Sequence, residues 1–446
     1  MNARTETMQS LGSASTTILN SGEHRKVAAA SLIGTAIEWY DYFIYGTCAA
    51  LLFPKLFFPS MDPLVGTIAA FATYAVGFAA RPVGAAIFGH YGDKIGRKAV
   101  LVLSLLLMGG STVAIGLLPT YQTAGAWAAV LLCSLRLIQG FAVGGEWGSA
   151  VVMAVEHAPK NRRGLYGSFP QIGVPAGLLL STGVFAIVSS SISETDMLAW
   201  GWRIPFLASI VMIIVGMFIR MNLHESPVFQ KIKESNEAAE APAMEVMKHH
   251  RRALLVTIGM KMLQNAIFYI YSVFMLSYIV GTLKLERSVG LNAILISSVI
   301  GLITLPLWSY LSDLIGRKKV YMFGTIASSL FVIPFFMMAE TGNVWILTIG
   351  MVIGLNVLHD AMYGPQAVYF SELFGTRVRM SGANIGYAVG AVLSGGLAPM
   401  IATALLAANG GKTWGISLYV IGLGLISVIA TAMARETYKD ALNEAD

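Results

Sequence analysis

Acidic side chains occur within long apolar stretches of this sequence, and two near its beginning could carry a proton. Glu38 and Asp41 are three residues apart, so on a helix they share a face that Tyr42 and Tyr45 continue. Two carboxylates this close in a low-dielectric setting do not both ionise easily, so one of them could hold a transferable proton. The alternative is a structural acid that is hydrogen-bonded to an arginine or a tyrosine.

Two arginines have similarly apolar neighbours. Arg136 stands in an Arg-x-x-x-Gly-x-x-x-Gly pattern, whose glycines let a neighbouring helix approach closely. Its expected partner is a carboxylate such as Glu38 or Asp41, in a coupling or substrate role or in a purely structural ion pair. Arg81 could bind a substrate carboxylate with both arms of its guanidinium, or form a salt bridge with the same acids. Because ionisable groups at bilayer depth are costly, both are candidates for function.

Two polar sets follow in the second half of the chain. Lys261 and Asp360 are a plausible opposite-charge pair, and His359 could titrate near physiological pH. The alternative is a His359–Asp360 pair that is only structural. His359 has no His or Cys at ligand spacing, so we expect no metal site. The first set is Lys261, Gln264, Asn265, Tyr269 and Ser272, the second is Asn356, His359, Asp360 and Tyr363, and Gln171 and Gln366 could add hydrogen bonds.

The composition shows what kind of element must position these groups. Of 446 residues, 56% are hydrophobic and 12% are charged, against about 25% charged in ordinary soluble domains. This excludes a water-soluble enzyme, a disordered chain and a disulfide scaffold, and Cys48 and Cys133 are interpreted as packed thiols. A spanning helix needs about 20 mostly apolar residues. We predict an all-α membrane protein with twelve such helices, at 27–51, 64–90, 98–118, 124–156, 164–190, 200–221, 251–281, 289–312, 319–339, 344–371, 380–407 and 413–435.

The distribution of Lys and Arg predicts the orientation. With the N-terminus inside, the inner segments hold 22 of the 30 basic residues and the outer segments hold four. We therefore expect both termini in the cytoplasm, and we interpret the basic residues as topology signals rather than a nucleic-acid surface. No signal peptide or lipidation motif is recognised. The predicted parts are a tail (1–26), a six-helix bundle (27–221), a cytoplasmic linker (222–250), a second six-helix bundle (251–436) and a tail (437–446).

The two halves share a loop between their second and third helices. Residues 89–100 (GHYGDKIGRKAV) align without a gap on 309–320 (SYLSDLIGRKKV). The glycines permit a tight reversal, the basic residues face the negative end of the preceding helix, and the aspartates can pair with an arginine or a helix N-terminus. Such loops could latch one side of the molecule or only set its topology. The gate candidates are Asp93, Gly96, Arg97, Lys98, Glu146, Glu156, Asp313, Gly316, Arg317, Lys318, Glu372 and Arg379.

This repeated loop resembles the signature of the major facilitator superfamily. Four further segments resemble its metabolite:proton symporter family: 38–46 (EWYDYFIYG), 78–84 (FAARPVG), 136–148 (RLIQGFAVGGEWG) and 200–206 (WGWRIPF). The resemblance covers about residues 27–435, and the position of Arg136 is similar to that of an arginine in the fourth helix of the superfamily. It implies two six-helix bundles that rock around a midplane site, and proton-coupled uptake.

We therefore expect a symporter of a small organic acid such as shikimate, embedded in the inner membrane as a monomer and driven by the proton gradient without a cofactor. The alternatives are a symporter of a zwitterionic osmolyte held by an aromatic cage of Trp39, Tyr42, Tyr269 and Tyr363, or a receptor or channel. The proton-coupling candidates are Glu38, Asp41, Arg136, His359 and Asp360. The substrate-binding candidates are Arg81, Arg136, Tyr42, Tyr45, Gln171, Lys261, Gln264, Asn265, Tyr269, Asn356, His359 and Tyr363.

Overall fold

The computed structural model describes residues 21–440, apart from 96, 145–150, 152–153, 156–157, 160, 222–241 and 376–377. Side chains are described from Leu32 onward, except for those of 89–101, 220 and 242–243. Of the gate candidates, Gly96, Glu146 and Glu156 and the side chains of Asp93, Arg97 and Lys98 therefore lie outside the described part. So do most of the predicted tails and linker.

Every regular element among the described residues is a helix. The first half of the chain forms α2 (Ser21–Leu51), α3 (Phe53–Phe57), α4 (Pro63–Ile95), α5 (Arg97–Gly116), α6 (Tyr121–Ala124), α7 (Ala126–Val143), α9 (Arg163–Ser191), α10 (Glu194–Asp196), η1 (Met197–Gly201), α11 (Arg203–Leu207) and α12 (Ser209–Met221). The η segments are short π-helices.

The second half of the chain repeats the pattern of long helices. It forms α14 (Pro242–His249), α15 (Arg251–Tyr269), η2 (Ile270–Phe274), α16 (Met275–Gly281), α17 (Arg287–Ile315), α18 (Arg317–Glu340), α19 (Val344–Val352), η3 (Ile353–His359), α20 (Asp360–Glu372), α21 (Arg379–Ala391), η4 (Val392–Gly396), α22 (Ala398–Ala408) and α23 (Trp414–Met433).

The helices agree with the predicted membrane spans in position. Each predicted span overlaps a helix, and the part of 124–156 beyond α7 lies largely outside the described residues. Nine helices in the described part are long and apolar enough to cross a membrane, or ten if the pair on either side of the 41° bend before α11 is one span. The described part of α5, Val102–Gly116, is a shorter apolar helix. Twelve crossings stay a prediction.

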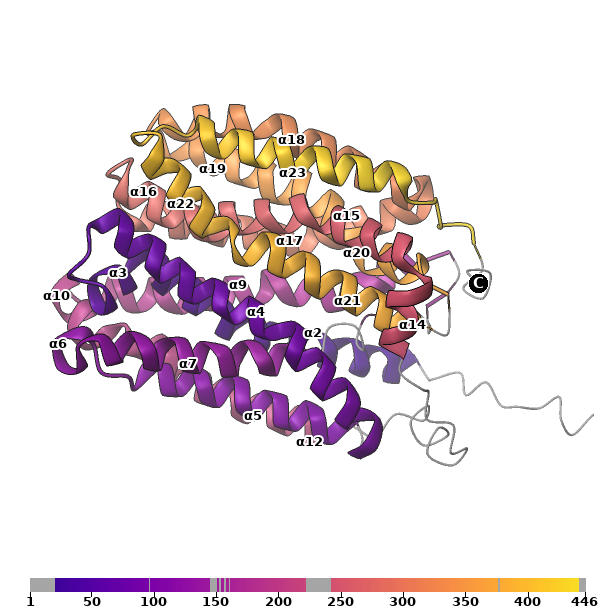
Figure 1. Ribbon diagram of the computed structural model, residues 1–446, viewed down its shortest axis with the longest axis horizontal. Coiled ribbons are helices and arrows are strands. Elements are labelled where there is room, and N and C mark those ends of the chain that lie inside the picture. The colour runs from indigo at the N-terminus through magenta and orange to yellow at the C-terminus, as the bar shows by residue number, and fades with distance from the viewer. Residues whose placement is uncertain are drawn as a thin grey trace, which may run out of the picture.

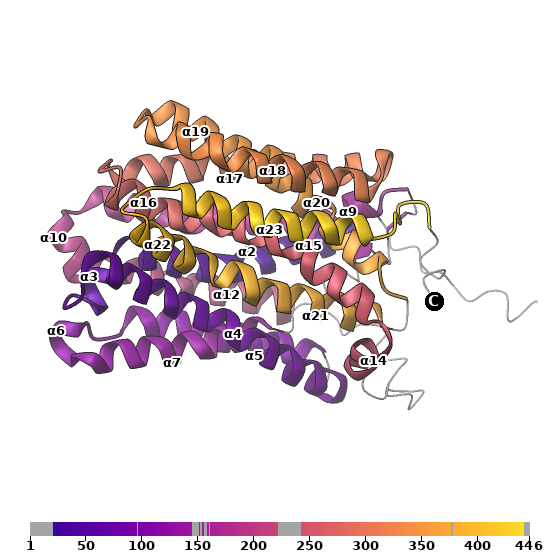
Figure 2. The same ribbon diagram turned by 45° about the horizontal axis from the view of Figure 1, so that its top comes forward.

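The two halves of the chain lie side by side with their long helices roughly parallel. In Figure 1 the helices α5, α7 and α12 lie along one edge of the molecule and α18, α19 and α23 along the other. After the turn of 45° in Figure 2, α5 and α7 still lie along one edge and α18 and α19 along the other. Between them α9 packs along α17, and α4 packs along α22, so these two pairs join the halves.

The distribution of polarity is the reverse of that in a soluble protein. Large apolar side chains such as Trp127, Leu330 and Trp345 are at least 70% exposed on the outer helices. Charged side chains are buried inside instead, among them Asp41, Arg81, Arg136, Lys261, His359 and Asp360. This is the arrangement expected of a protein whose outer surface faces hydrocarbon.

Glycines permit close helix crossings, as the sequence predicted for the helix that carries Arg136. On α7, a Cβ at Gly140 would collide with the carbonyl group of Gly77 on α4. On α21, a Cβ at Gly390 would lie 2.7 Å from the Cβ of Lys261. The glycine pattern of α7 therefore brings Arg136 against α4, and that of α21 fixes the position of Lys261 on α15.

This crossing gives a direct test. We expect Gly140→Ala to lower the thermal unfolding midpoint of the purified protein by several degrees, because the added methyl group overlaps a backbone carbonyl and overpacking costs about 1–3 kcal/mol. Gly110→Ala on α5 is the matched control, since a Cβ there meets nothing within 4 Å among the described residues. Equal midpoints for the two variants, measured by fluorescence-detected melting, would contradict the close crossing.

Candidate functional site

A small cavity lies between the two halves at the middle of the bundle. Helices α2 and α9 contribute to it from the first half of the chain, and α15, η3, α20 and α21 from the second. Its volume is about that of one water molecule. The lining residues are Trp39, Val174, Lys261, Gln264, Asn265, Phe268, Tyr269, His359, Tyr363 and Tyr387.

The helices around the cavity depart from α geometry at three places. The π-helix η3 includes Asn356 and His359, and η2 begins directly after Tyr269. Gly395 in η4 packs so tightly on Asn265 and Tyr269 that a Cβ there would collide with the Asn265 amide. Single π turns within longer helices are frequent at functional sites, and here they redirect polar side chains toward the cavity.

Two buried arginines lie on the first-half side of the cavity, and both stack on aromatic rings. The Arg81 Cζ lies 4.3 Å from the ring centroid of Tyr42 and 4.4 Å from that of Phe78. The Arg136 Cζ lies 4.1 Å from the centroid of Tyr42 and 4.3 Å from that of Tyr45. Within the described part of the chain, Nε of Arg81 and Nε and Nη2 of Arg136 are buried without a hydrogen-bond partner. Both guanidinium groups therefore keep donors for another group.

The expected ion pair between Arg136 and Asp41 is wrong. Arg136 Nη1 donates to the Oε1 of Gln139, and the Asp41 carboxylate instead accepts from the Ser209 hydroxyl at 2.6 Å. Gln139 Nε2 in turn donates to the Thr112 hydroxyl at 2.8 Å. The arginine has a neutral partner one helical turn away, so its charge is not cancelled by Asp41. Glu38 on α2 is partly buried.

Lys261 is held by neutral groups on the second-half side. Its Nζ donates to Gln264 Oε1 at 2.7 Å and to Gln366 Oε1 at 3.0 Å. It also lies 3.8 Å from the ring centroid of Tyr387. Gln366 Nε2 donates to the Tyr321 hydroxyl at 3.0 Å, which fixes the orientation of that amide. The expected pair between Lys261 and Asp360 is therefore wrong.

Asp360 pairs with its own neighbour instead. Its Oδ1 lies 3.2 Å from His359 Nδ1, and its Oδ2 accepts from the Thr304 hydroxyl at 2.6 Å. The other ring nitrogen of the histidine, Nε2, lies 2.6 Å from Gln264 Nε2. Asp360, His359, Gln264 and Lys261 thus form one continuous polar chain beside the cavity.

The remaining substrate-binding candidates divide into two groups. Asn265, Tyr269 and Tyr363 line the cavity, and the Tyr269 hydroxyl is buried without a partner in the described part. Gln171 and Asn356 lie nearby, and their side chains donate hydrogen bonds to backbone carbonyl groups. Gln171 Nε2 donates to Tyr363 O in the other half at 2.9 Å, and Asn356 Nδ2 donates to Ser297 O at 2.9 Å.

Five further predicted residues do not line the cavity: Arg81, Arg136, Tyr42, Tyr45 and Ser272. Tyr45 bonds Thr73 at 2.5 Å, and the Ser272 hydroxyl donates to Phe268 O. Sequence reasoning missed Gln139, Ser209, Thr304 and Tyr387. Gln139 could have been found, because it follows Arg136 by three residues as Gln264 follows Lys261.

The loop of the second half ties the two halves together at one end of the molecule. Asp313 pairs with Arg317 at 2.6 Å and also accepts from the backbone N–H groups of Gly164 and Leu165, in the first turn of α9, at 2.8 and 3.0 Å. Gly316 makes the reversal with φ of 111°. The expectation that Asp313 pairs with an arginine or a helix N-terminus is confirmed for both partners.

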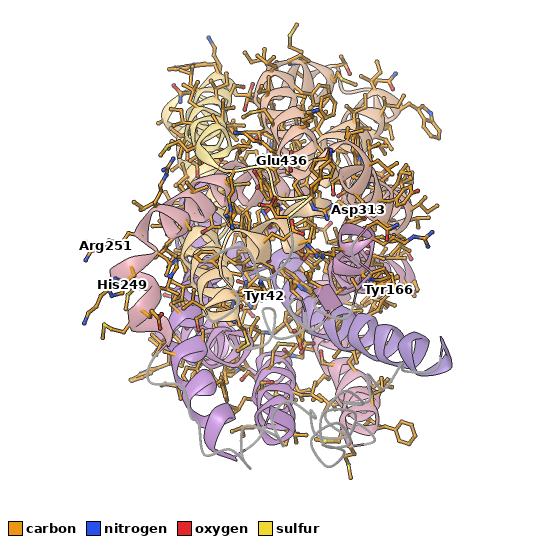
Figure 3. All side chains as sticks on the ribbon, turned by 90° about the vertical axis from the view of Figure 1, so that its right-hand side faces the viewer. Tyr42, Tyr166, His249, Arg251, Asp313 and Glu436 are labelled. Carbon is orange, nitrogen blue, oxygen red and sulfur yellow. The ribbon has the colours of Figure 1, made fainter. Side chains whose placement is uncertain are left out.

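Further acidic groups complete this end, which Figure 3 views face-on with Asp313 and Glu436 labelled. Glu372 lies 3.4 Å from Arg317 Nε and 3.5 Å from Nη1 of Arg163, which belongs to the other half. Glu436 accepts from the backbone N–H groups of Arg317 and Lys318, the first residues of α18. The Lys318 side chain donates to carbonyl groups at the end of α23, and Arg379 Nε donates to Ser371 O.

A contact also crosses the halves at the opposite end, where Arg287 Nη2 donates to Ser189 O at 2.9 Å. Because polar contacts join the halves at both ends and the cavity between them is so small, the structure shows a closed conformation.

Comparison with known proteins decides the family, since the Major Facilitator Superfamily profile matches residues 31–384. The chain belongs to the major facilitator superfamily. It is 39% identical to the shikimate transporter of Escherichia coli (strain K12), over 93% of this chain and 95% of that protein. It is 33% identical to the proline/betaine transporter of the same strain, over 94% of this chain and 85% of that protein.

A solved structure has the same fold. The proton:xylose symporter XylE bound to 6-bromo-6-deoxy-D-glucose superposes with a TM-score of 0.73 at 19% identity, covering 96% of this chain and 99% of that one. The chain is therefore a multi-pass membrane transporter of the major facilitator superfamily, and not an enzyme.

The contact of Asp313 with α9 predicts how one end opens. In a cysteine-free background carrying Gln171→Cys as a reporter between the halves, we expect Asp313→Ala to raise the rate of labelling by a soluble maleimide several-fold. The reason is that the N-terminus of α9, in the first half, loses the Asp313 carboxylate of the second half that caps it.

Glu436→Ala is the matched control, because Glu436 caps α18 within its own half. It should lower the melting temperature without raising the labelling rate. Equal labelling of Asp313→Ala and the parent protein would show that this cap does not hold the halves together.

Proposed function

We propose that this transporter is a proton symporter of a small organic acid, with shikimate as the representative substrate. The carrying observation is a group of three buried cations, of which Lys261 lines the cavity and the two arginines lie close to its lining. In the described part of the chain, Arg81, Arg136 and Lys261 form no ion pair, and the first two retain unpartnered donors. An incoming carboxylate would meet positive charge that has only amides and aromatic rings as partners.

The similarity to proline/betaine transporters keeps a zwitterionic osmolyte as the second candidate. The cavity lining contains the aromatic rings that such a substrate would need. An ammonium group needs free ring faces. Here Arg81 already lies over Trp39 and Tyr42, and Lys261 lies over Tyr363 and Tyr387. A second cation would be repelled by those already present, so the geometry favours an acid.

The proposed cycle is alternating access around this cavity. The end that carries Asp313 and Glu372 faces the cytoplasm, as the distribution of basic residues predicts, and both termini lie on that side of the inner membrane. Proton uptake at Asp41 and at the His359–Asp360 pair accompanies binding of the acid, so the loaded protein does not bury the acid's negative charge uncompensated when it reorients. The proton gradient supplies the energy, no cofactor takes part, and a monomer contains the whole site.

Uptake into proteoliposomes tests this function. We expect labelled shikimate to accumulate when the lumen is more alkaline than the outside, and the accumulation to vanish with an uncoupler. Dicarboxylates, aromatic acids, citrate and betaine serve as competitors that define the substrate class. Uptake that ignores the gradient would contradict symport, competition by betaine alone would favour the osmolyte, and a lack of counterflow exchange would favour a channel or receptor.

A substitution at Asp41 tests the coupling separately from binding. We expect Asp41→Asn to exchange labelled shikimate in counterflow, but to accumulate it only to the level seen with an uncoupler, because an amide cannot bind and release a proton. Asp62→Asn is the control, since Asp62 is exposed near the start of α4. Full gradient-driven accumulation by Asp41→Asn would remove Asp41 from the coupling role.

A further inference from the structure

The amide of Gln264 lies between the two charged parts of the second-half polar chain. Its Oε1 accepts from Lys261 at 2.7 Å and from Gln366 Nε2 at 3.2 Å, while its Nε2 faces His359 Nε2 at 2.6 Å. An amide oxygen can only accept and an amide nitrogen can only donate. The two donors on one side therefore fix the oxygen toward Lys261 and present the NH2 group to the histidine.

This orientation determines the protonation state of His359 in the structure. Its Nε2 must accept from the Gln264 NH2 group, so the ring proton is on Nδ1 and is donated to Asp360 Oδ1. The histidine is neutral, and both of its nitrogens are used. The titratable and charged groups around this part of the site are Asp360, Tyr363, Lys261, Tyr387, Tyr269 and Arg81.

A proton added to His359 is incompatible with this arrangement. It would be placed on Nε2 and would face the Gln264 NH2 group, so that two donors would oppose each other across 2.6 Å. Rotation of the Gln264 amide by half a turn removes the conflict, because its oxygen then accepts from the imidazolium. The same rotation turns the NH2 group toward Lys261 Nζ and Gln366 Nε2. Lys261 then loses one of its two hydrogen-bond acceptors, and Gln366 Nε2 keeps only the Tyr321 hydroxyl.

We propose that Gln264 is a positioning residue that couples proton binding to substrate binding: protonation of His359 rotates the Gln264 amide and releases Lys261 for a carboxylate of the substrate. This inference rests on the proposed function and names the residue that couples binding of the proton to binding of the organic acid. Lys261 keeps Gln366 Oε1 and the rings of Tyr363 and Tyr387 after the rotation, and it borders the cavity. Because linkage is reciprocal, a carboxylate on Lys261 favours the rotated amide and so favours the protonated histidine. Acid and proton therefore bind together.

Two substitutions remove the rotation by opposite chemistry. Gln264→Met offers no hydrogen bond to either neighbour. Gln264→Glu offers acceptors to both, so a protonated His359 and Lys261 are satisfied together without any rotation. In each variant the charge on His359 no longer depends on whether Lys261 has a carboxylate. Gln366→Met is the matched control, because Gln366 also accepts from Lys261 while its other bonds are to Gln264 and Tyr321.

The first measurement is the number of protons taken up for each shikimate bound, obtained by titration calorimetry of the purified protein in buffers of different ionisation enthalpy. We expect this number to fall by one in Gln264→Met and in Gln264→Glu. In Gln366→Met we expect weaker binding with an unchanged number of protons. An unchanged number in either Gln264 variant that melts like the parent protein would overturn the proposal.

The second measurement needs no substrate and separates this proposal from the proposed function. Nitrogen NMR of protein labelled with 15N-histidine, with His359→Asn used to assign the signal, reports the tautomer directly. We expect neutral His359 to carry its proton on Nδ1 in the parent protein. The Nε2–H tautomer would overturn the switch even if shikimate is transported. The Nδ1–H tautomer in a protein that does not bind shikimate would leave the switch supported and the substrate assignment wrong.

Discussion

Charge buried away from water must have a partner, and in this protein the partners of the central cations are neutral. A cation–π contact contributes about 0.5–2 kcal/mol and a hydrogen bond to a charged group about 1.5–3 kcal/mol. Arg81, Arg136 and Lys261 have several such contacts each, which is enough to keep them inside the bundle. A carboxylate would hold them more firmly, but under the proposed function it would also occupy the position that an anionic substrate needs. Neutral partners leave the charge available.

This constraint explains both errors in the predicted pairing. Sequence spacing shows which residues share a helix face, as Lys261 and Gln264 do. Spacing cannot show how far one helix is rotated or shifted against another, and opposite charges were assumed to find each other. The structure instead gives Arg136 and Lys261 a glutamine three residues further along the same helix. A glutamine on the same helix is held near the cation by the helix itself. This contact therefore does not depend on how neighbouring helices fit together.

The positions of the helices were easier to predict than the contacts between them. A bilayer requires about 20 apolar residues for each crossing, and that requirement is visible in any window of the sequence. The repeated loop was equally visible, and the two roles expected of Asp313 are both present. Its partner on α9 could not be predicted, because Gly164 and Leu165 contribute only backbone N–H groups, which every residue except proline has. The π-helices left no readable pattern either, although η3 carries His359, which lines the cavity.

The contacts at the end of the transporter and those of its central cations differ in which groups can replace them when they break. At the end with Asp313 and Glu372, the bonds between the halves join carboxylates to backbone N–H groups and to Arg163. When the halves separate there, water reaches these groups and hydrates each of them. At the centre, Lys261 borders a space for one water molecule and the two arginines are buried nearby, so full hydration is not available to them. Opening an end is therefore a modest rearrangement, whereas changing the partners of the central charges requires a group that carries its own negative charge into the cavity.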